Sequence, residues 1–382
     1  MSDDDEKKTP NWLSTILNLE DYWCDMWGIF NPYLDPFTHM KFSKKLPMYD
    51  LTAYHKYPKH NFVYDKLWVC KSQGLVCGTL SNLPNVQNVE YPIFIKPRYG
   101  HKTATSKDCY KINSFEEALP YMHKKDMMWN EFIEESEGMT DFILLNGTIV
   151  YQMTLKYSDK QNGFIDEWKY ISEKNKPPVK VSNWLKTHLH DFTGVVNIQY
   201  RGDKIIEVGL RLARGGAYIK STNSVELVKN INLIIDKGSW DYKKAEKIKY
   251  TPFYSFKCYS TMPILYLFPQ HFIDRQMKAY DCKKFYEYYF EPSGKSGMVF
   301  FQFLNEDFNK GLACKNHLET LLFSTHLFLL LLIIYTIKLF SDKSSYKNYV
   351  LTFLIIFVML RFINPLTTQY SLFKAQRQQY FG

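Results

Sequence analysis

The sequence predicts an α+β fold followed by a pair of apolar helices near the C-terminus. Helix-like and strand-like segments alternate from Asn61 onward, which is the pattern of a mixed α and β core. Two pairs of strand-like segments are joined by short glycine-containing turns, and two long apolar runs lie between residues 321 and 366. The chain has 382 residues, of which 46% are hydrophobic, so we expect folded lobes with sizeable cores.

Charge and cysteine content argue against several classes of protein. The chain has 48 basic and 39 acidic residues, a net charge of +9, with no basic tail or known nucleic-acid motif, so we expect no nucleic acid partner. Its seven cysteines are widely spaced and lack metal-ligand spacing, which indicates reduced thiols in a cytosolic compartment. The N-terminal sequence MSDDDEKKTPNW is acidic, so we expect no secretory signal and no glycan at Asn146.

The first predicted elements are a helix, a strand and a second helix. The segment from Tyr64 to Gly74 has apolar positions at helical spacing and ends in glycine, which predicts a helix with a C-terminal stop. The short apolar run from Tyr91 to Lys96 ends at a proline and predicts a buried strand. Ser114 is followed three residues later by Glu117, a capping box that predicts a helix extending to Met122.

Antiparallel strands dominate the middle of the chain. The predicted strands are 127–133, 141–145, 148–157, 195–200 and 204–208. The Asn146-Gly147 dipeptide lies between the second and third of them and is the strongest short signal for a β-hairpin. The last two strands flank Arg201-Gly202-Asp203, which predicts a second hairpin.

The composition divides the chain into five parts. They are an N-terminal lead-in segment (1–60), an α+β core (61–230), an aromatic-rich C-terminal module (231–316), a helical hairpin (317–366) and a tail (367–382). The role of the lead-in segment and of the aromatic-rich module is not readable from their residues.

From about Asp65 to Gly216 the segments resemble the ATP-grasp superfamily of carboxylate–amine ligases. YDKLWVCKSQGLVCGTLSNLP is similar to the family's opening segment, and YPIFIKP to the strand that ends in its nucleotide lysine. WNEFIEESEGMTDFILLNG is similar to its hinge strand and the following hairpin, and GVVNIQYRGDKIIEVGLRLARGG to its metal-binding hairpin and arginine loop. The resemblance implies an ATP- and Mg²⁺-dependent ligase that activates a carboxylate substrate as an acyl phosphate.

The resemblance also implies site residues. They are Lys66 and Lys96 for the phosphates, Glu131, Phe132 and Ile133 for the adenine hinge, Glu137 for the ribose, Gln199 and Glu207 for Mg²⁺, and Arg211 and Arg214 for the transferred phosphoryl group and the substrate carboxylate. These residue types suit the ligand, because phosphates need cations and Mg²⁺ prefers oxygen ligands. Each residue type also has an ordinary interpretation: a solvated lysine, an acidic turn, a cross-strand polar pair or surface arginines.

Two departures from the family pattern keep a second function open. The final metal strand of the family reads Glu-x-Asn-x-Arg, whereas this chain has Gly209 in place of the asparagine. The phosphate-covering loop, residues 99–108, contains only one glycine, although Thr103, Thr105 and Ser106 are potential hydroxyl donors. The alternative to a ligase is therefore a non-catalytic, membrane-tethered structural or scaffolding protein of a virion or organelle with a degenerate ATP-grasp fold.

The apolar C-terminal segment predicts an integral membrane protein. Leu321 to Phe340 contains about the number of apolar residues needed to cross a bilayer, and after a polar loop a second run covers 349–366 with Arg361 near its end. This pattern predicts a transmembrane hairpin with the lipid bilayer as a partner and the globular part in the cytosol. A single span with an interfacial second helix, or a buried helix of a soluble core, are the other interpretations.

Overall fold

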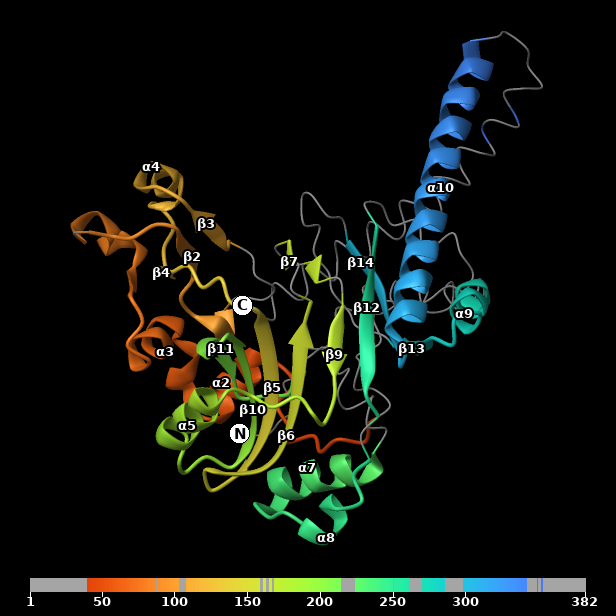
Figure 1. Ribbon diagram of the computed structural model, residues 1–382. Helices are drawn as coiled ribbons and strands as arrows, with labels where there is room; N and C mark the ends of the chain where they lie inside the picture. The colour runs from red at the N-terminus through yellow and green to blue at the C-terminus, as the bar shows by residue number, and fades with distance from the viewer. Residues whose placement is uncertain are drawn as a thin grey trace. The chain divides into compact units, whose positions relative to one another are not determined.

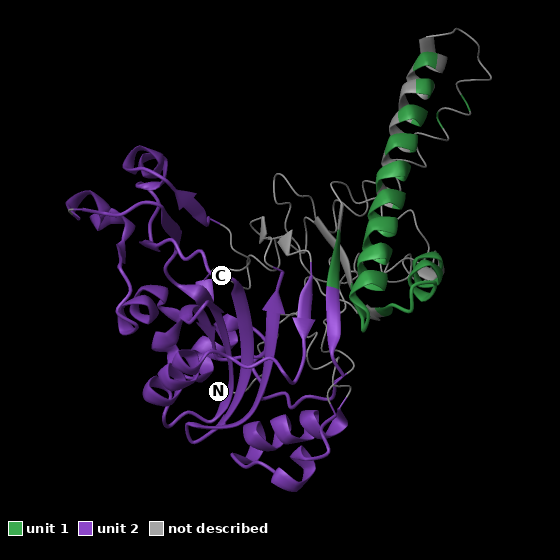
Figure 2. Cartoon of the chain, in the orientation of Figure 1, with its two compact units in different colours: residues 1–35, 256–377 green, residues 36–255, 378–382 purple. Residues whose placement is uncertain are grey.

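The structure of the protein is a computed structural model (Figure 1). It describes residues 40–86, 88–102, 108–158, 161–162, 165–166, 168–213, 224–249, 251–260, 270–285 and 298–341, together with Tyr349 and Thr352. The chain divides into two compact units: unit 1 contains residues 1–35 and 256–377, and unit 2 contains residues 36–255 and 378–382 (Figure 2).

Unit 2 contains a small antiparallel sheet with the strand order β1-β4-β2-β3. Its strands are β1 (Cys77–Thr79), β2 (Ile93–Pro97), β3 (Tyr110–Ile112) and β4 (Met127–Glu131). Ile93, Ile95 and Trp129 pack in its apolar core, so the prediction of a buried strand after Tyr91 is confirmed. Because residues alternate in direction along a strand, burial of both isoleucines fixes the orientation of β2 and of Lys96 near its end.

Short helices connect and cover the strands of this region. They are α2 (Asp50–Lys56), η1 (Asn61–Tyr64), α3 (Lys66–Ser72), η2 (Leu80–Asn85) and η3 (Gly100–Lys102). Asp65 caps α3 by accepting a hydrogen bond from the backbone N–H of Leu67 at 3.0 Å. Gly74 follows the helix with φ of 74°, so the predicted helix and its glycine stop are both confirmed.

The predicted helix after Ser114 is shorter than expected. Helix α4 spans Phe115–Ala118 and continues only as a 3₁₀ turn, η4 (Leu119–Tyr121), because Pro120 has no N–H for an α-helical bond. The predicted capping box is wrong: Ser114 makes no side-chain cap hydrogen bond, and Glu117 instead accepts from the backbone N–H of Asn113 at 2.8 Å.

The larger sheet of unit 2 has the order β11-β10-β5-β6-β9, and the first residues of β12 pair with β9. Its strands are β5 (Glu137–Leu145), β6 (Thr148–Tyr157), β9 (Lys169–Ile171), β10 (Gly194–Arg201) and β11 (Lys204–Gly209), with a separate pair of β7 (Gln161–Asn162) and β8 (Ile165–Asp166). All ladders are antiparallel.

Both predicted hairpins are present in this sheet. Asn146 and Gly147 join β5 to β6 with φ of 48° and 73°, the left-handed pair that a tight hairpin turn requires. A Cβ atom on Gly147 would lie 1.9 Å from the carbonyl oxygen of His190, so only glycine fits there. Gly202 has φ of 55° and turns β10 into β11.

Helices pack on the larger sheet and form its core. Helix α5 (Val179–His188) buries Val181 and Leu185 in one cluster with Phe142 of β5 and Val196 of β10. Helix α7 (Val225–Lys237) contacts β10 and is followed by the short helix α8 (Tyr242–Ala245). Ile205 and Val208 of β11 belong to the same cluster, so the strand that carries Glu207 is anchored on its apolar side.

Unit 1 contains strands and helices from the last third of the chain. They are β12 (Phe253–Ser260), α9 (Gln270–Lys278), β13 (Lys283–Phe285), β14 (Met298–Asn305) and α10 (Phe308–Ser341), with β14 between β12 and β13. Phe256 stacks on Phe303 with ring centroids 5.5 Å apart. Gly311 lets the start of α10 approach this pair, because a Cβ there would lie 2.1 Å from the Phe256 ring.

The predicted membrane hairpin is not supported by the structure. Helix α10 has 34 residues and includes the run from Leu321 to Phe340. Within the described part of the chain, however, no helix is both long enough and apolar enough to span a bilayer. Of the second predicted span only Tyr349 and Thr352 are described, and the tail from residue 367 lies outside the described residues.

Candidate functional site

The β10–β11 hairpin places Gln199 and Glu207 directly opposite each other. The register pairs Gln199 with Glu207 and Asn197 with Gly209. Side chains paired in this way stand roughly 5 Å apart on one face of a sheet. The two residues expected to hold Mg²⁺ are therefore brought together, and they offer one carboxylate and one amide oxygen to the same space.

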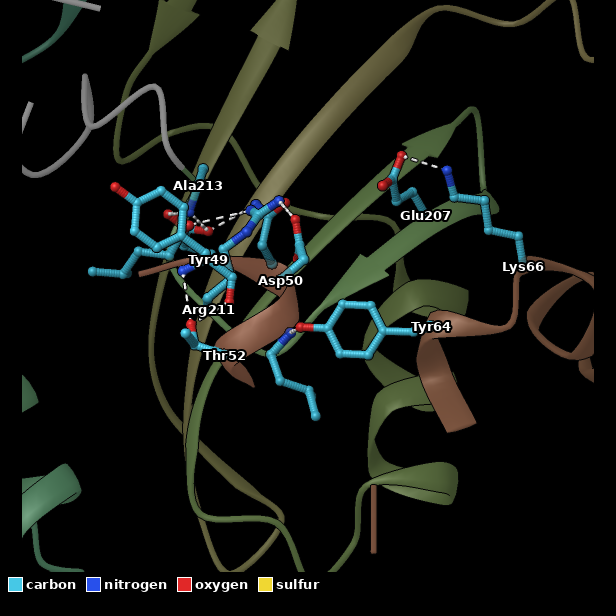
Figure 3. A network of polar contacts seen from close by, with 12 residues as sticks. Tyr49, Asp50, Thr52, Tyr64, Lys66, Glu207, Arg211 and Ala213 are labelled. Carbon is cyan, nitrogen blue, oxygen red and sulfur yellow. Dashed lines mark hydrogen bonds and ion pairs between the residues drawn. The ribbon is translucent and has the colours of Figure 1, made fainter. Parts of the chain in front are cut away.

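Lys66 faces Glu207 from the start of α3. Its Nζ lies 3.3 Å from Oε2 of Glu207 (Figure 3), and its side chain is only 9% exposed. Burial opposes the charged form of Lys66, yet the Glu207 carboxylate raises its pKa above the ordinary value. Burial alone would raise the pKa of Glu207, but the charges of Lys66 and Arg211 hold it below the usual range. Both groups are thus charged at neutral pH.

Lys96 reaches the same strand from β2. Its Nζ donates to the carbonyl oxygen of Ile206 at 3.2 Å, one residue before Glu207, and the residue is buried. Burial, and after it the positive charge of Lys66, lower the pKa of Lys96. The two predicted phosphate-binding lysines therefore converge on residues 206–207, and an added anion would stabilise the charge of Lys96.

The loop after β2 passes close to Lys66 and Glu207. A Cβ atom on Gly100 would lie 3.4 Å from Cε of Lys66 and 3.6 Å from Oε1 of Glu207. His101 next to it is buried and stacks on Tyr54, with ring centroids 3.7 Å apart. The predicted hydroxyl donors of the loop, Thr103, Thr105 and Ser106, lie outside the described residues.

Arg211 follows β11 and is engaged by a residue that the sequence did not reveal. Its Nη2 donates to Oδ2 of Asp50 at 2.6 Å, and the two side chains are 13% and 12% exposed (Figure 3). Burial opposes the charge of Arg211, but Asp50 outweighs it and raises the arginine pKa. Asp50 begins helix α2, 161 residues earlier in the chain, so no local pattern could connect it to Arg211. Arg214, the second predicted arginine, lies outside the described residues.

Asp141 is a second acid that sequence reasoning missed. It is 1% exposed on β5, and its Oδ1 accepts from Nδ2 of Asn197 at 2.7 Å and from the backbone N–H of Ala213 at 3.1 Å. Burial raises the pKa of Asp141 to about 7, although these hydrogen bonds and the charge of Arg211 oppose the shift. Asp141 thus fixes the backbone shortly after Arg211.

The predicted adenine hinge lies at the end of β4. The backbone N–H of Glu131 donates to the carbonyl oxygen of Val76 at 3.0 Å, and that of Phe132 to Pro92 at 3.1 Å. Ile133 is buried directly after them. Two of the three hinge N–H groups are therefore used within the protein, which the sequence could not indicate.

Glu137 is paired rather than open. It is the first residue of β5, and its Oε2 accepts from Nη2 of Arg201 at 3.1 Å across the β5–β10 ladder. The carboxylate that the sequence assigned to the ribose hydroxyls is thus already engaged with a cation. Arg201 is its cross-strand neighbour because of the strand register, which no pattern within either strand could have indicated.

The residues suit a hard cation only in part. Gln199 and Glu207 supply oxygen donors, but among the described residues no group of three His, Cys, Asp or Glu side chains could hold a metal ion. The missing side chain at Gly209 accounts for one absent donor. In its place stands the Asp50 carboxylate, whose Oδ1 would be 2.8 Å from a Cβ at position 209.

Comparisons with known proteins identify the fold. No protein-family model matches the chain, and no curated protein matches it either. Among solved structures, an L-amino acid ligase from Bacillus licheniformis is similar with a TM-score of 0.50 at 13% identity, covering 71% of this chain and 76% of that one. An N5-carboxyaminoimidazole synthase from Aspergillus clavatus, in complex with ADP and 5-aminoimidazole ribonucleotide, matches with a TM-score of 0.49 at 12% identity, covering 70% and 75%.

The class of fold is therefore ATP-grasp, as the sequence resemblance predicted. The similarity covers 71% of this chain, so it extends well beyond the segment from about Asp65 to Gly216 in which the resemblance was found. At 13% identity, this structural similarity shows the fold of the protein and not its activity.

Proposed function

We propose that the protein is an ATP- and Mg²⁺-dependent ligase that activates a carboxylate substrate. The observation that carries this proposal is the convergence of Lys66, Lys96 and Glu207 on one stretch of β11, with Arg211 four residues beyond Glu207. Buried cations beside a carboxylate on an ATP-grasp fold suit a nucleoside triphosphate and its metal. The cofactors of the proposed ligase are therefore ATP and Mg²⁺.

In the proposed reaction an oxygen of the substrate carboxylate attacks the γ-phosphorus of ATP, and ADP leaves. An amine then attacks the acyl phosphate, inorganic phosphate leaves, and the amine loses a proton. Lys66 and Lys96 stabilise the phosphates, and Arg211 holds the transferred phosphoryl group. Glu207 and Gln199 would hold Mg²⁺, which supplies charge neutralisation between the phosphates. The hinge role falls to Ile133, because the N–H groups of the two residues before it are engaged.

A second candidate function is a non-catalytic scaffold that keeps the fold. Three observations favour it: the internal hydrogen bonds of Glu131 and Phe132, the Glu137–Arg201 ion pair, and the missing side chain at Gly209. Each removes a group that the ligase interpretation uses. A scaffold would retain the buried ion pairs for folding alone.

Nucleotide binding by the whole 382-residue chain decides between these two functions. Isothermal titration with ATP, ADP and a non-hydrolysable ATP analogue, each with and without Mg²⁺, should give Mg²⁺-dependent binding if the ligase interpretation holds. Phosphate release is then measured over a panel of carboxylates and amines. Absence of binding at millimolar nucleotide would contradict the ligase proposal, and binding without turnover on any pair would favour the scaffold.

We also propose that the segment from Leu321 to Phe340 inserts into a membrane, with the globular part on the cytosolic side. Large apolar side chains on α10 are exposed: Phe323, Leu327, Phe328, Leu331 and Tyr335. Four of these lie four residues apart and follow one side of the helix, where they need an apolar surrounding. Among the described residues the six cysteines form no disulfide, and Cys24 lies outside the described residues.

Fractionation of cells that express the chain tests this attachment. The chain is expected to stay in the membrane pellet after carbonate washing, and Leu327→Lys with Leu331→Lys is expected to release it. The matched control places the same substitutions on exposed Val179 and Val225 of α5 and α7. Release of the unmodified chain by carbonate alone would contradict membrane insertion, and a glycan on Asn146 would contradict the cytosolic orientation.

A further inference from the structure

Asp50 occupies the space that a side chain at position 209 would need. A Cβ atom on Gly209 would lie 2.8 Å from Oδ1 of Asp50, closer than real Cβ atoms approach another group, and 3.6 Å from Cζ of Arg211. Gly209 does not have positive φ, so its backbone would accept any residue. The requirement for glycine therefore comes from the Asp50 carboxylate and not from the conformation of β11.

The Asp50 carboxylate is buried and is paired with the positive charge of Arg211. Oδ2 accepts from Nη2 of Arg211 at 2.6 Å, and the hydroxyl of Tyr64 accepts from the backbone N–H of Leu210 at 2.9 Å (Figure 3). Burial, and after it the charge of Asp50, raise the pKa of Tyr64, so its hydroxyl stays protonated beside the carboxylate. Three elements distant in sequence, α2, η1 and the end of β11, thus meet at one arginine.

Arg211 keeps capacity for a ligand in this arrangement. Its Nη1 donates to the carbonyl oxygen of Leu212 at 3.2 Å, while its Nε is buried and has no hydrogen-bond partner within the described part of the chain. A buried donor without a partner is costly, so an incoming anionic oxygen is favoured there. Alternation along β11 puts Glu207 and position 209 on the same face, so the arginine, Asp50 and the lysine pair border one site.

We propose that Asp50 is a positioning residue that holds Arg211 toward the transferred phosphoryl group. Its carboxylate comes from helix α2 and takes the place of the side chain that β11 lacks at Gly209. This inference rests on the proposed ligase function. Under this inference the glycine at position 209 does not mark the loss of a metal ligand. It leaves the space that the Asp50 carboxylate occupies. The alternative, in which Asp50 acts as an internal anion that blocks Arg211, predicts the opposite effect on binding.

The first test compares ATP with ADP, because only ATP carries the phosphoryl group that Arg211 would hold. Asp50→Asn in the whole chain is expected to reduce ATP affinity about tenfold while ADP affinity is unchanged. Asp241→Asn is the matched control, since Asp241 is an ion-paired acid at the start of α8 and is expected to leave both affinities unchanged. Unchanged ATP affinity in Asp50→Asn, or an increase, would overturn the inference and leave nucleotide binding itself intact.

The second test moves the carboxylate from α2 to β11. Gly209→Asp alone is expected to clash with Asp50, and Asp50→Ala alone leaves Arg211 without its partner, so each should lower the thermal unfolding midpoint. The double variant restores a carboxylate beside Arg211 and is expected to unfold at a higher temperature than either single variant. If the decrease in the unfolding midpoint of the double variant equalled the sum of the decreases of the two single variants, the inference would be overturned. This measurement needs no nucleotide, so it tests whether Asp50 replaces a side chain at position 209 even if the chain binds no ATP, whereas the positioning of Arg211 is tested by the comparison of ATP with ADP.

Discussion

The Lys66 ammonium lies 3.3 Å from the Glu207 carboxylate and joins the first residue of α3 to strand β11. The pair is buried on the lysine side and about one third exposed on the glutamate side. In the proposed ligase, Lys66 and the metal would therefore share one carboxylate.

Replacement of Glu207 by Gln should remove the Mg²⁺-dependent part of ATP binding. The substitution keeps the shape of the side chain but removes the charge that attracts the metal, while the hinge at the end of β4 is untouched. Isothermal titration at zero and saturating Mg²⁺ separates the two contributions. Glu135→Gln, at an exposed acid paired with Lys204, is the control that should change neither. Equal loss with and without Mg²⁺ would contradict a metal role for Glu207.

Replacement of Lys96 by Ala should weaken ATP binding about ten- to a hundredfold, because a charge-assisted phosphate contact contributes roughly 1.5–3 kcal/mol. Lys180→Ala, at an exposed lysine of α5, should leave the affinity unchanged. The dissociation constants of the three chains measure the effect. An affinity of Lys96→Ala equal to that of the unmodified chain would exclude Lys96 from the phosphate site.

Nucleotide affinity should fall as pH rises through the lowered pKa of Lys96. Burial lowers this pKa in the free protein, whereas a bound phosphate favours the charged lysine, so binding takes up a proton in the window between the free and bound pKa. Titrations at a series of pH values from neutral up to the ordinary pKa of lysine measure the slope. Lys96→Arg should bind with little pH dependence, because arginine stays charged. Identical slopes in the two chains would show that another group titrates.

The stability of the Asp141→Asn variant should increase progressively relative to that of the unmodified chain as pH rises from about 4 to 7. The folded pKa of Asp141, about 7, lies above the unfolded value, so the folded state binds more protons in this window and loses stability as pH rises. Asparagine keeps an oxygen for Asn197 and Ala213 but cannot ionise.

Unfolding midpoints of the two chains across pH measure this effect. Asp191→Asn is the control of opposite sign, because hydrogen bonds from Lys59 and His60 lower the pKa of Asp191. That substitution should cost stability at neutral pH and little in acid. A midpoint difference for Asp141→Asn that is constant over the same pH range would show that Asp141 does not ionise in the folded protein.

Local sequence patterns predicted the elements that depend on neighbouring residues. The Asn146-Gly147 turn and the β10–β11 hairpin were predictable from their turn residues and alternating strands. The pairing of Gln199 with Glu207 was not, because a register shift between Gln199 and Tyr200 moves Glu207, and not Ile206, opposite Gln199. The capping box at Ser114 was wrong because the Glu117 carboxylate accepts from the backbone N–H of Asn113, one residue before the expected donor.

The sequence by itself determined which strands form hairpins and that β2 is buried. It also singled out Lys66 and Lys96 as the candidate phosphate-binding cations. Only the tertiary structure decided which of these groups have partners: Asp50 for Arg211, Arg201 for Glu137, and Val76 and Pro92 for the hinge N–H groups. The physical reason is that hydrogen bonds and ion pairs act over a few ångströms in space, whereas sequence periodicity reports only neighbours within one or two turns. Gly209 appears as a missing ligand in the sequence and as the space for a carboxylate in the folded protein.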